Sequence, residues 1–108
     1  MALLAAQQLP LSGLQATYAS AAVGGDLAPV GEKLVLHVRN GSGSTVTVTA
    51  ATPGTVGDLA VADAIQAVPA AGSVFIPLKS VFRDPMTGRA SITYSAVTTV
   101  TVAVLQLP

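Results

Sequence analysis

Residues 33–50 read KLVLHVRNGSGSTVTVTA and contain the clearest structural signal in the chain. Within 34–38 every second residue is apolar, and within 45–49 valine alternates with threonine. A period of two is typical of strands that bury one face and expose the other. The residues expected to point into the core are Leu34, Leu36, Val38, Val46 and Val48.

The two alternating segments are separated by Asn40-Gly41-Ser42-Gly43. Asparagine and glycine tolerate positive φ angles, and Asn-Gly is a strong signal for a tight turn between paired strands. We therefore predict that 33–39 and 45–49 form a β-hairpin.

Residues 59–68, LAVADAIQAV, are ambiguous between helix and strand. Alanine favours a helix, whereas Val61, Asp63, Ile65 and Ala67 alternate as in a strand. We predict a strand, because Pro69-Ala70-Ala71-Gly72 is typical of the turn that follows one.

Further strands are expected after this turn. In 73–78 the apolar residues again alternate, and Pro77 removes a backbone donor, so this strand is an edge or ends there. Asp84-Pro85 predicts a type I turn, with Gly88 available for a left-handed conformation. Residues 93–96 and 98–105 are expected to form two strands, or one strand with a bulge near Val97.

The chain has 108 residues, which fits a single domain. Short strands, frequent turn signals and the lack of a convincing helix predict an all-β fold, an antiparallel β-sandwich or small barrel that is Ig-like or jelly-roll-like. Residues 1–30 are irregular in pattern, and we expect an extended N-terminal arm and first strand there. Residues 31–108 are expected to form the sandwich body.

Charged residues make up 9% of the chain, whereas roughly 25% is typical of soluble domains. Five basic residues balance five acidic ones, so we expect no nucleic-acid partner. The chain has no cysteine, which excludes disulfides and thiolate chemistry. The first ten residues lack a positive charge, which disfavours a secretory signal, and no apolar run is long enough for a membrane-spanning helix.

Few residues suggest catalysis or ligand binding. His37 is the single histidine, and no nucleophile or orienting partner is readable for it, so we interpret it as structural or exposed. Asp58 and Asp63 are a poor match to a calcium loop, which clusters more acidic ligands. We expect no catalytic, cofactor-binding or metal-binding residues, and no enzymatic activity.

Arg83, Asp84 and Arg89 concentrate three of the ten charges within seven residues. One interpretation is a solvated turn stabilised by local pairing, and the other is a docking loop, because arginine is enriched at interfaces. With Phe82 and Tyr18, these residues are our candidate interface set.

The segment 99–107, TVTVAVLQL, lacks the charges that commonly protect edge strands. It has the composition of an aggregation-prone window. We therefore expect neighbouring copies or another shell of protein to cover exposed edges, so that the protein works in a symmetric assembly.

Residues 36–50, LHVRNGSGSTVTVTA, and residues 68–105 carry a family resemblance. The second stretch combines a Val-Pro-Ala-Gly-type turn, a Phe-x-Asp turn and the strand TYSAVTTVTVA. In this order the motifs resemble short head proteins of tailed bacteriophages, particularly those infecting actinobacteria. The chain departs from the pattern by an extra alanine in 68–72 and by its alanine-rich segment 59–68.

The resemblance implies a capsid decoration or minor capsid protein that binds the major capsid protein and stabilises the phage head. It implies a location in the virion, synthesis in the cytoplasm of the bacterial host, and no cofactor. A homo-oligomer is expected, with a trimer favoured. The alternatives are another virion component (tail, connector or head fibre) and a carbohydrate-binding or adhesion module, although the latter commonly presents more aromatic residues.

Overall fold

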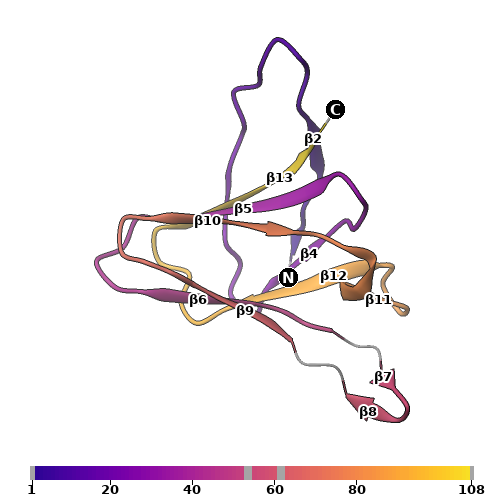
Figure 1. Ribbon diagram of the computed structural model, residues 1–108. Coiled ribbons are helices and arrows are strands. Elements are labelled where there is room, and N and C mark those ends of the chain that lie inside the picture. The colour runs from indigo at the N-terminus through magenta and orange to yellow at the C-terminus, as the bar shows by residue number, and fades with distance from the viewer. Residues whose placement is uncertain (1, 53–54, 61–62, 108) are drawn as a thin grey trace.

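Two β-sheets pack face to face in the computed structural model, which describes residues 2–52, 55–60 and 63–107 (Figure 1). The predicted all-β sandwich is confirmed. Each sheet remains open at its edges, so the chain forms a sandwich and not a closed barrel.

Sheet A has the strand order β1 (Ala2–Leu3), β4 (Asp26–Ala28), β12 (Arg89–Tyr94), β6 (Val46–Ala50) and β9 (Ala64–Val68), with β11 (Arg83–Asp84) also on β12. Sheet B has the order β10 (Ser73–Pro77), β5 (Leu34–Asn40), β13 (Val100–Gln106) and β2 (Ala6–Gln8), with β3 (Ala19–Ser20) also on β13. The short strands β7 (Thr55–Val56) and β8 (Leu59–Ala60) pair with each other, and the 3₁₀ turn η1 (Ser80–Phe82) precedes β11. The pairs β1–β4 and β2–β13 are parallel, and the other pairs are antiparallel.

The two strands expected at 33–39 and 45–49 are present as β5 and β6, but the predicted hairpin between them is wrong. β5 pairs with β10 and β13 in sheet B, whereas β6 pairs with β9 and β12 in sheet A. The chain crosses from one sheet to the other after Asn40, so the apolar faces of β5 and β6 face each other across the core. In a hairpin both faces would lie on the same side of one sheet and could not pack against each other.

Two arms, one with β5 and β6 and the other with β9 and β10, pair along their length and form a two-stranded ribbon that bends from sheet B into sheet A. Arg39 lies opposite Ser73 on one side of the fold, and Val46 lies opposite Val68 on the other. Residues 40–45 of one arm and 69–72 of the other make the corner. The corner contains more residues of the first arm than of the second. Extra residues in one of two paired strands bend the pair, as in a β-bulge.

Asn40 holds this corner together and is only 2% exposed. Its Nδ2 donates to the carbonyls of Ser44 (2.7 Å), Val68 (3.1 Å) and Pro69 (3.3 Å). Its Oδ1 accepts from the backbone N–H (2.9 Å) and the hydroxyl (2.6 Å) of Ser42. One side chain thus satisfies buried backbone groups on both arms of the ribbon, which would otherwise lose their hydrogen bonds to water.

The core between the sheets is aliphatic and comes from the alternating positions of the strands. The predicted inward residues Leu36, Val38, Val46 and Val48 are buried, and Leu34 packs partly buried against them. The C-terminal strands contribute further buried residues, Ile92, Val100, Val102 and Val104. Small alanines at 28, 50 and 90 let the sheets approach closely.

Several turn predictions are confirmed. β10 is an edge strand of sheet B and ends at Pro77. The Asp84 carbonyl accepts from the Thr87 N–H at 3.1 Å, and Gly88 has a φ of +71°. The turn at 69–72 is also present, with a 2.9 Å hydrogen bond from the Gly72 N–H to the Pro69 carbonyl.

The C-terminal segment forms two separate strands in different sheets, β12 and β13, but β12 begins at Arg89 and ends at Tyr94, so the expected bounds 93–96 are wrong. β13 lies inside sheet B, with β5 along one side and β2 and β3 along the other. The expectation that 99–107 exposes an unguarded edge is therefore wrong for β13. The chain's own N-terminal segment covers that edge, which the composition of 99–107 alone does not reveal.

Residues 2–28 contribute strands to both sheets, and an extended N-terminal arm is not confirmed. Between β2 and β3 the chain forms a loop, 9–18, which projects at the top of Figure 1. The base of this loop is closed by Gln7, whose side chain exchanges two hydrogen bonds with the backbone of Thr17, at 2.6 and 2.8 Å.

The ambiguous segment 59–68 contains strands at both ends, β8 and β9, while Val61 lies outside the described residues. β8 pairs with β7 around Gly57 and Asp58, whose φ angles are +58° and +65°. Two consecutive positive φ angles define the tight type I′ turn of a hairpin. The tight hairpin turn is thus at 57–58 and not at 40–41, where it was predicted.

Replacing Asn40 with alanine is expected to lower the free energy of unfolding by about 1–3 kcal/mol, because buried carbonyls of both arms lose their donor. Urea denaturation followed by circular dichroism measures this change. Gln66→Ala is the matched control, since this exposed amide bonds only to the neighbouring Ala67 carbonyl. Equal stability of the two variants would contradict the role assigned to Asn40.

Candidate functional site

The outer face of sheet B carries two rows of side chains that run across three strands. In one row Arg39 of β5 lies between Ser73 of β10 and Thr101 of β13. In the next row His37 lies between Phe75 and Ala103. Residues that are far apart in the sequence are thereby brought side by side, with Arg39 between two hydroxyl residues on the neighbouring strands.

Tyr18, which precedes β3, joins the two rows. Its Oη lies 2.6 Å from His37 Nδ1, and the two groups share a hydrogen bond. The Cζ of Arg39 lies over the Tyr18 ring at 4.6 Å from the centroid, within the range of a cation–π contact. On the other side, the His37 and Phe75 rings stack at 4.2 Å with an interplanar angle of 7°. We call Tyr18, His37, Arg39 and Phe75 the aromatic–arginine cluster.

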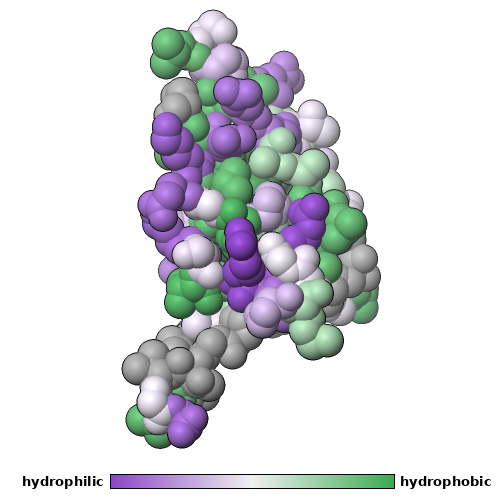
Figure 2. Space-filling model, turned by 90° about the vertical axis from the view of Figure 1, so that its right-hand side faces the viewer, coloured by the Kyte–Doolittle hydropathy of each residue, from purple (hydrophilic) through white to green (hydrophobic). Residues whose placement is uncertain are grey.

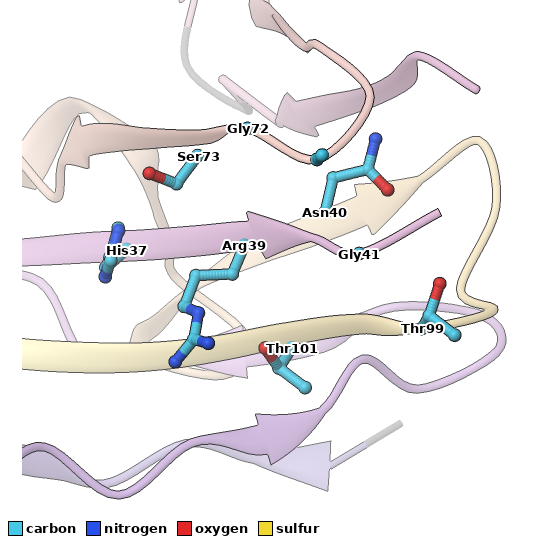
Figure 3. Close-up of a pocket in the computed structure, with 9 residues that line it drawn as sticks. His37, Arg39, Asn40, Gly41, Gly72, Ser73, Thr99 and Thr101 are labelled. Atoms are coloured by element: carbon cyan, nitrogen blue, oxygen red, sulfur yellow. The ribbon is translucent and has the colours of Figure 1, made fainter. Parts of the chain in front are cut away.

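An open pocket of about 600 Å³ adjoins this cluster (Figure 3). Its lining includes His37, Arg39, Asn40, Ser73, Thr99 and Thr101. Figure 3 shows the Arg39 side chain extending from β5 across β13 toward Thr101, while Ser73 lies on the opposite side of β5. The pocket is therefore lined by hydroxyls and one full positive charge, with no carboxylate among its lining residues.

The acidic residues of the chain lie in other places. Glu32 pairs with Lys79 at 3.7 Å, Asp63 accepts from the Thr52 N–H, and Asp84 accepts from the Met86 N–H. Asp58 is at the tip of the β7–β8 hairpin, and Asp26 is buried in sheet A. Within the described part of the chain, Arg39 forms no ion pair.

Burial is the main reason why the pKa of His37 is lowered from its ordinary value of 6.5, and the nearby charge of Arg39 lowers it further. The imidazole is therefore neutral at pH 7. A neutral ring keeps the hydrogen bond to Tyr18 and the stack on Phe75 without adding a second positive charge beside Arg39.

The predicted interface residues fall in two places. Arg83 and Asp84 lie on β11 and Arg89 begins β12, so these three share one hairpin. Asp84 and Arg89 bond locally or to the backbone, the latter through Nη1 to the Leu4 carbonyl at 3.4 Å. No ion pair joins them within the described residues.

The other two predicted interface residues lie apart from each other. Phe82 is partly buried at the end of η1 and packs against the core. Tyr18 belongs to the aromatic–arginine cluster on sheet B. The structure thus does not bring the five predicted residues together, and their role as an interface stays a prediction.

A second polar group, Asp26 with Tyr94, lies inside sheet A. Asp26 is fully buried, and its Oδ2 accepts from the Tyr94 hydroxyl at 2.7 Å and from the Ala22 N–H at 3.3 Å, while Oδ1 has no partner among the described residues. Burial, the hydrogen bond to Asp26 and the charge of that carboxyl together raise the pKa of Tyr94. Because solvent does not reach Asp26, this pair links β4 to β12 and is no open binding site.

The sequence did not reveal the aromatic–arginine cluster. His37 was interpreted in isolation, and no role was assigned to Phe75. The missing information was that β5 pairs with β10, since the register then puts His37 directly opposite Phe75. Cross-strand aromatic pairs of this kind follow from pairing and not from composition.

No group of three or more histidine, cysteine or acidic residues in the described ranges could hold a metal ion. Those ranges also contain no helix long and apolar enough to span a membrane. In comparisons with known proteins, no family model, no curated protein and no solved structure matches this chain.

The single histidine makes the cluster directly measurable. We expect the Cε1 proton of His37 to titrate in NMR spectra with a pKa below 6.5, and Arg39→Gln to move that pKa upward by removing the nearby charge. Because the folded pKa is lowered, the unfolded chain takes up the proton more readily, so stability falls as the pH drops below 7 through this range.

Lys33→Gln is the control, since it removes an exposed positive charge just before β5 that does not contribute to the lowered pKa of His37, and it is expected to leave the His37 titration unchanged. A pKa at or above 6.5 in the unaltered protein would contradict the assigned environment of the ring.

Proposed function

We propose that this chain is a structural virion protein, a capsid decoration or minor capsid protein that binds the major capsid protein and stabilises the phage head. The resemblance of residues 36–50 and 68–105 to short phage head proteins supports this proposal. The β-sandwich architecture is compatible with it, because such a protein needs a compact body and a docking surface. No active site is required for the task.

The observation that carries the proposal is the exposure of large apolar side chains on projecting segments. Leu11 on the loop 9–18 is 95% exposed, Met86 on the β11–β12 turn is 92% exposed, and Leu59 on β8 is 74% exposed. Figure 2 shows apolar atoms at both projecting ends of the molecule, above and below a mixed surface. Apolar surface gains about 25 cal/mol per Å² when it leaves water, so these tips gain stability by inserting into a neighbouring protein.

Repetition makes such weak contacts sufficient. A single apolar side chain contributes only about 1.5–3 kcal/mol when it is buried completely. On a shell, however, each copy engages several subunits, and linked contacts add through high effective concentration. Copies that bind the assembled shell but not its free subunits stabilise the shell by mass action.

The proposal includes self-association, with a trimer as the expected state. The open side of the sandwich between the edge strands β9 and β10 contains an apolar groove of about 190 Å³. Its lining includes Ile65, Phe75, Pro77 and Phe82. Edge strands next to an apolar groove offer both unpaired backbone groups and apolar contact to a second copy.

Quantitative mass spectrometry of purified virions from the encoding genome tests the head assignment. A decoration protein that follows the capsid lattice is expected in an amount comparable with that of the major capsid protein. A connector component forms a single ring and would be far less abundant, which would favour the alternative of a tail or connector role. Absence of the chain from virions would refute the proposal.

Sedimentation equilibrium of the isolated chain tests the self-association. The unaltered chain is expected to sediment as a trimer, and Ile65→Lys is expected to shift it to monomer, because a charge would be buried without a partner in the groove. Val23→Lys is the matched control, since Val23 is also exposed, at 81%, but lies on the turn before β4. A chain that stays monomeric at high concentration would show that this part of the proposal is wrong.

A further inference from the structure

We propose that Arg39, with the hydroxyls of Ser73 and Thr101, binds a carboxylate presented by an acidic peptide segment of another protein. The site is the outer face of sheet B at the pocket of Figure 3. That the carboxylate belongs to a neighbouring virion protein rests on the proposed function, whereas the chemistry of the site rests on the geometry alone.

The donors at this site have no partner in the described part of the chain. The Arg39 guanidinium forms no ion pair with a described residue and donates no hydrogen bond to one, although arginine carries five N–H donors. The hydroxyls of Ser73 and Thr101 also form no hydrogen bond within the described residues. Ser73 and Thr101 lie on either side of Arg39 on adjacent strands, and all three residues line the same pocket.

The guanidinium is held in place before any ligand binds. Its Cζ lies over the Tyr18 ring, Tyr18 is fixed by the hydrogen bond to His37, and His37 stacks on Phe75. Each of these contacts restricts the next side chain in the series. A donor that is already ordered loses less conformational entropy on binding, which favours affinity and specificity.

A carboxylate fits these donors better than other ligands do. A neutral sugar would leave the charge of Arg39 unpaired, because the pocket lining has no carboxylate, and the Asn40 oxygen is already used by Ser42. Phosphate groups are commonly bound by several cations, whereas this lining contains one arginine. The planar fork of a single arginine matches the two oxygens of one carboxylate.

The neighbouring Phe75 adds an apolar surface for the peptide around the carboxylate. One face of its ring stacks on His37, and the side chain is still 62% exposed. An aliphatic portion of a glutamate side chain, or a residue next to it, can cover the part of this ring that faces His37 and Arg39, while the rest of the ring lines the groove between β9 and β10. The site thus combines one charge with one apolar contact, as interfaces that are centred on arginine and aromatic residues do.

The test is an NMR titration of the isolated full-length chain with the peptide acetyl-Gly-Asp-Glu-Gly-amide. The matched probe is acetyl-Gly-Asn-Gln-Gly-amide, which has the same shape without charge. We expect saturable shifts of the amide signals of β5, β10 and β13 and of the His37 ring with the acidic peptide only. N-acetylglucosamine serves as a third probe for the carbohydrate-binding alternative.

Variants assign the effect to the guanidinium. Arg39→Gln is expected to weaken binding by about tenfold or more, the factor that corresponds to one hydrogen bond to a charged group. Arg39→Lys keeps the charge without the planar fork, and its affinity is expected to lie between those of the unaltered chain and Arg39→Gln. Lys33→Gln removes a charge outside the pocket and is expected to bind as the unaltered chain does. The fold of each variant is verified by its amide spectrum.

The inference is overturned if the acidic peptide gives no saturable shift, if the uncharged peptide binds equally well, or if Arg39→Gln binds unchanged. Stronger shifts with N-acetylglucosamine than with the acidic peptide would also overturn it, in favour of a sugar site. These results do not depend on virions. Absence of the chain from virions together with acidic-peptide binding would refute the proposed function and leave the site standing.

Discussion

The burial of Asn40 at the corner between the two sheets is the constraint on which the rest of the structure depends. Its amide supplies hydrogen bonds to backbone groups of both arms of the folded ribbon, at the place where the ladder of each sheet is interrupted. Only with this corner closed do β5 and β6 face each other across the core. The same corner sets the register that places Arg39 opposite Ser73 and His37 opposite Phe75.

The low charge of the chain is accommodated in a specific way. The C-terminal strand β13, which has no charged residue, is paired along both of its sides, so its backbone and its alternating valines are covered by the chain itself. The apolar surface that remains lies on projecting segments and in the groove between β9 and β10. Apolar contact with other proteins would then involve loop tips and one open side, while the central strands stay protected from edge-to-edge aggregation.

The positively charged side chains differ in the partners that surround them. Lys79 has an acidic neighbour in Glu32, and Arg89 contacts a backbone carbonyl. Arg39 instead lies on an aromatic ring beside a pocket without carboxylates. The protein has few charges, so one ordered positive charge with free donors can orient a partner on a surface that is otherwise apolar and rich in hydroxyls. Electrostatic complementarity sets orientation more than affinity.

The sequence by itself determined the fold class, the positions of the strands β5, β6, β10 and β13, and which of their residues point inward, because a period of two is a local property of the chain. It also determined the turns at 69–72 and 84–88, where proline, aspartate and glycine restrict the backbone locally. Only the tertiary structure decided which strands pair. The Asn40-Gly41 signal has the same local chemistry in a hairpin and in a sheet-crossing corner, and the outcome depends on where the buried faces find a partner layer. The pairing that covers the edge of β13 and the aromatic–arginine cluster could likewise not be predicted from the sequence. Both arise from contacts between segments that are distant along the chain and are brought together by packing.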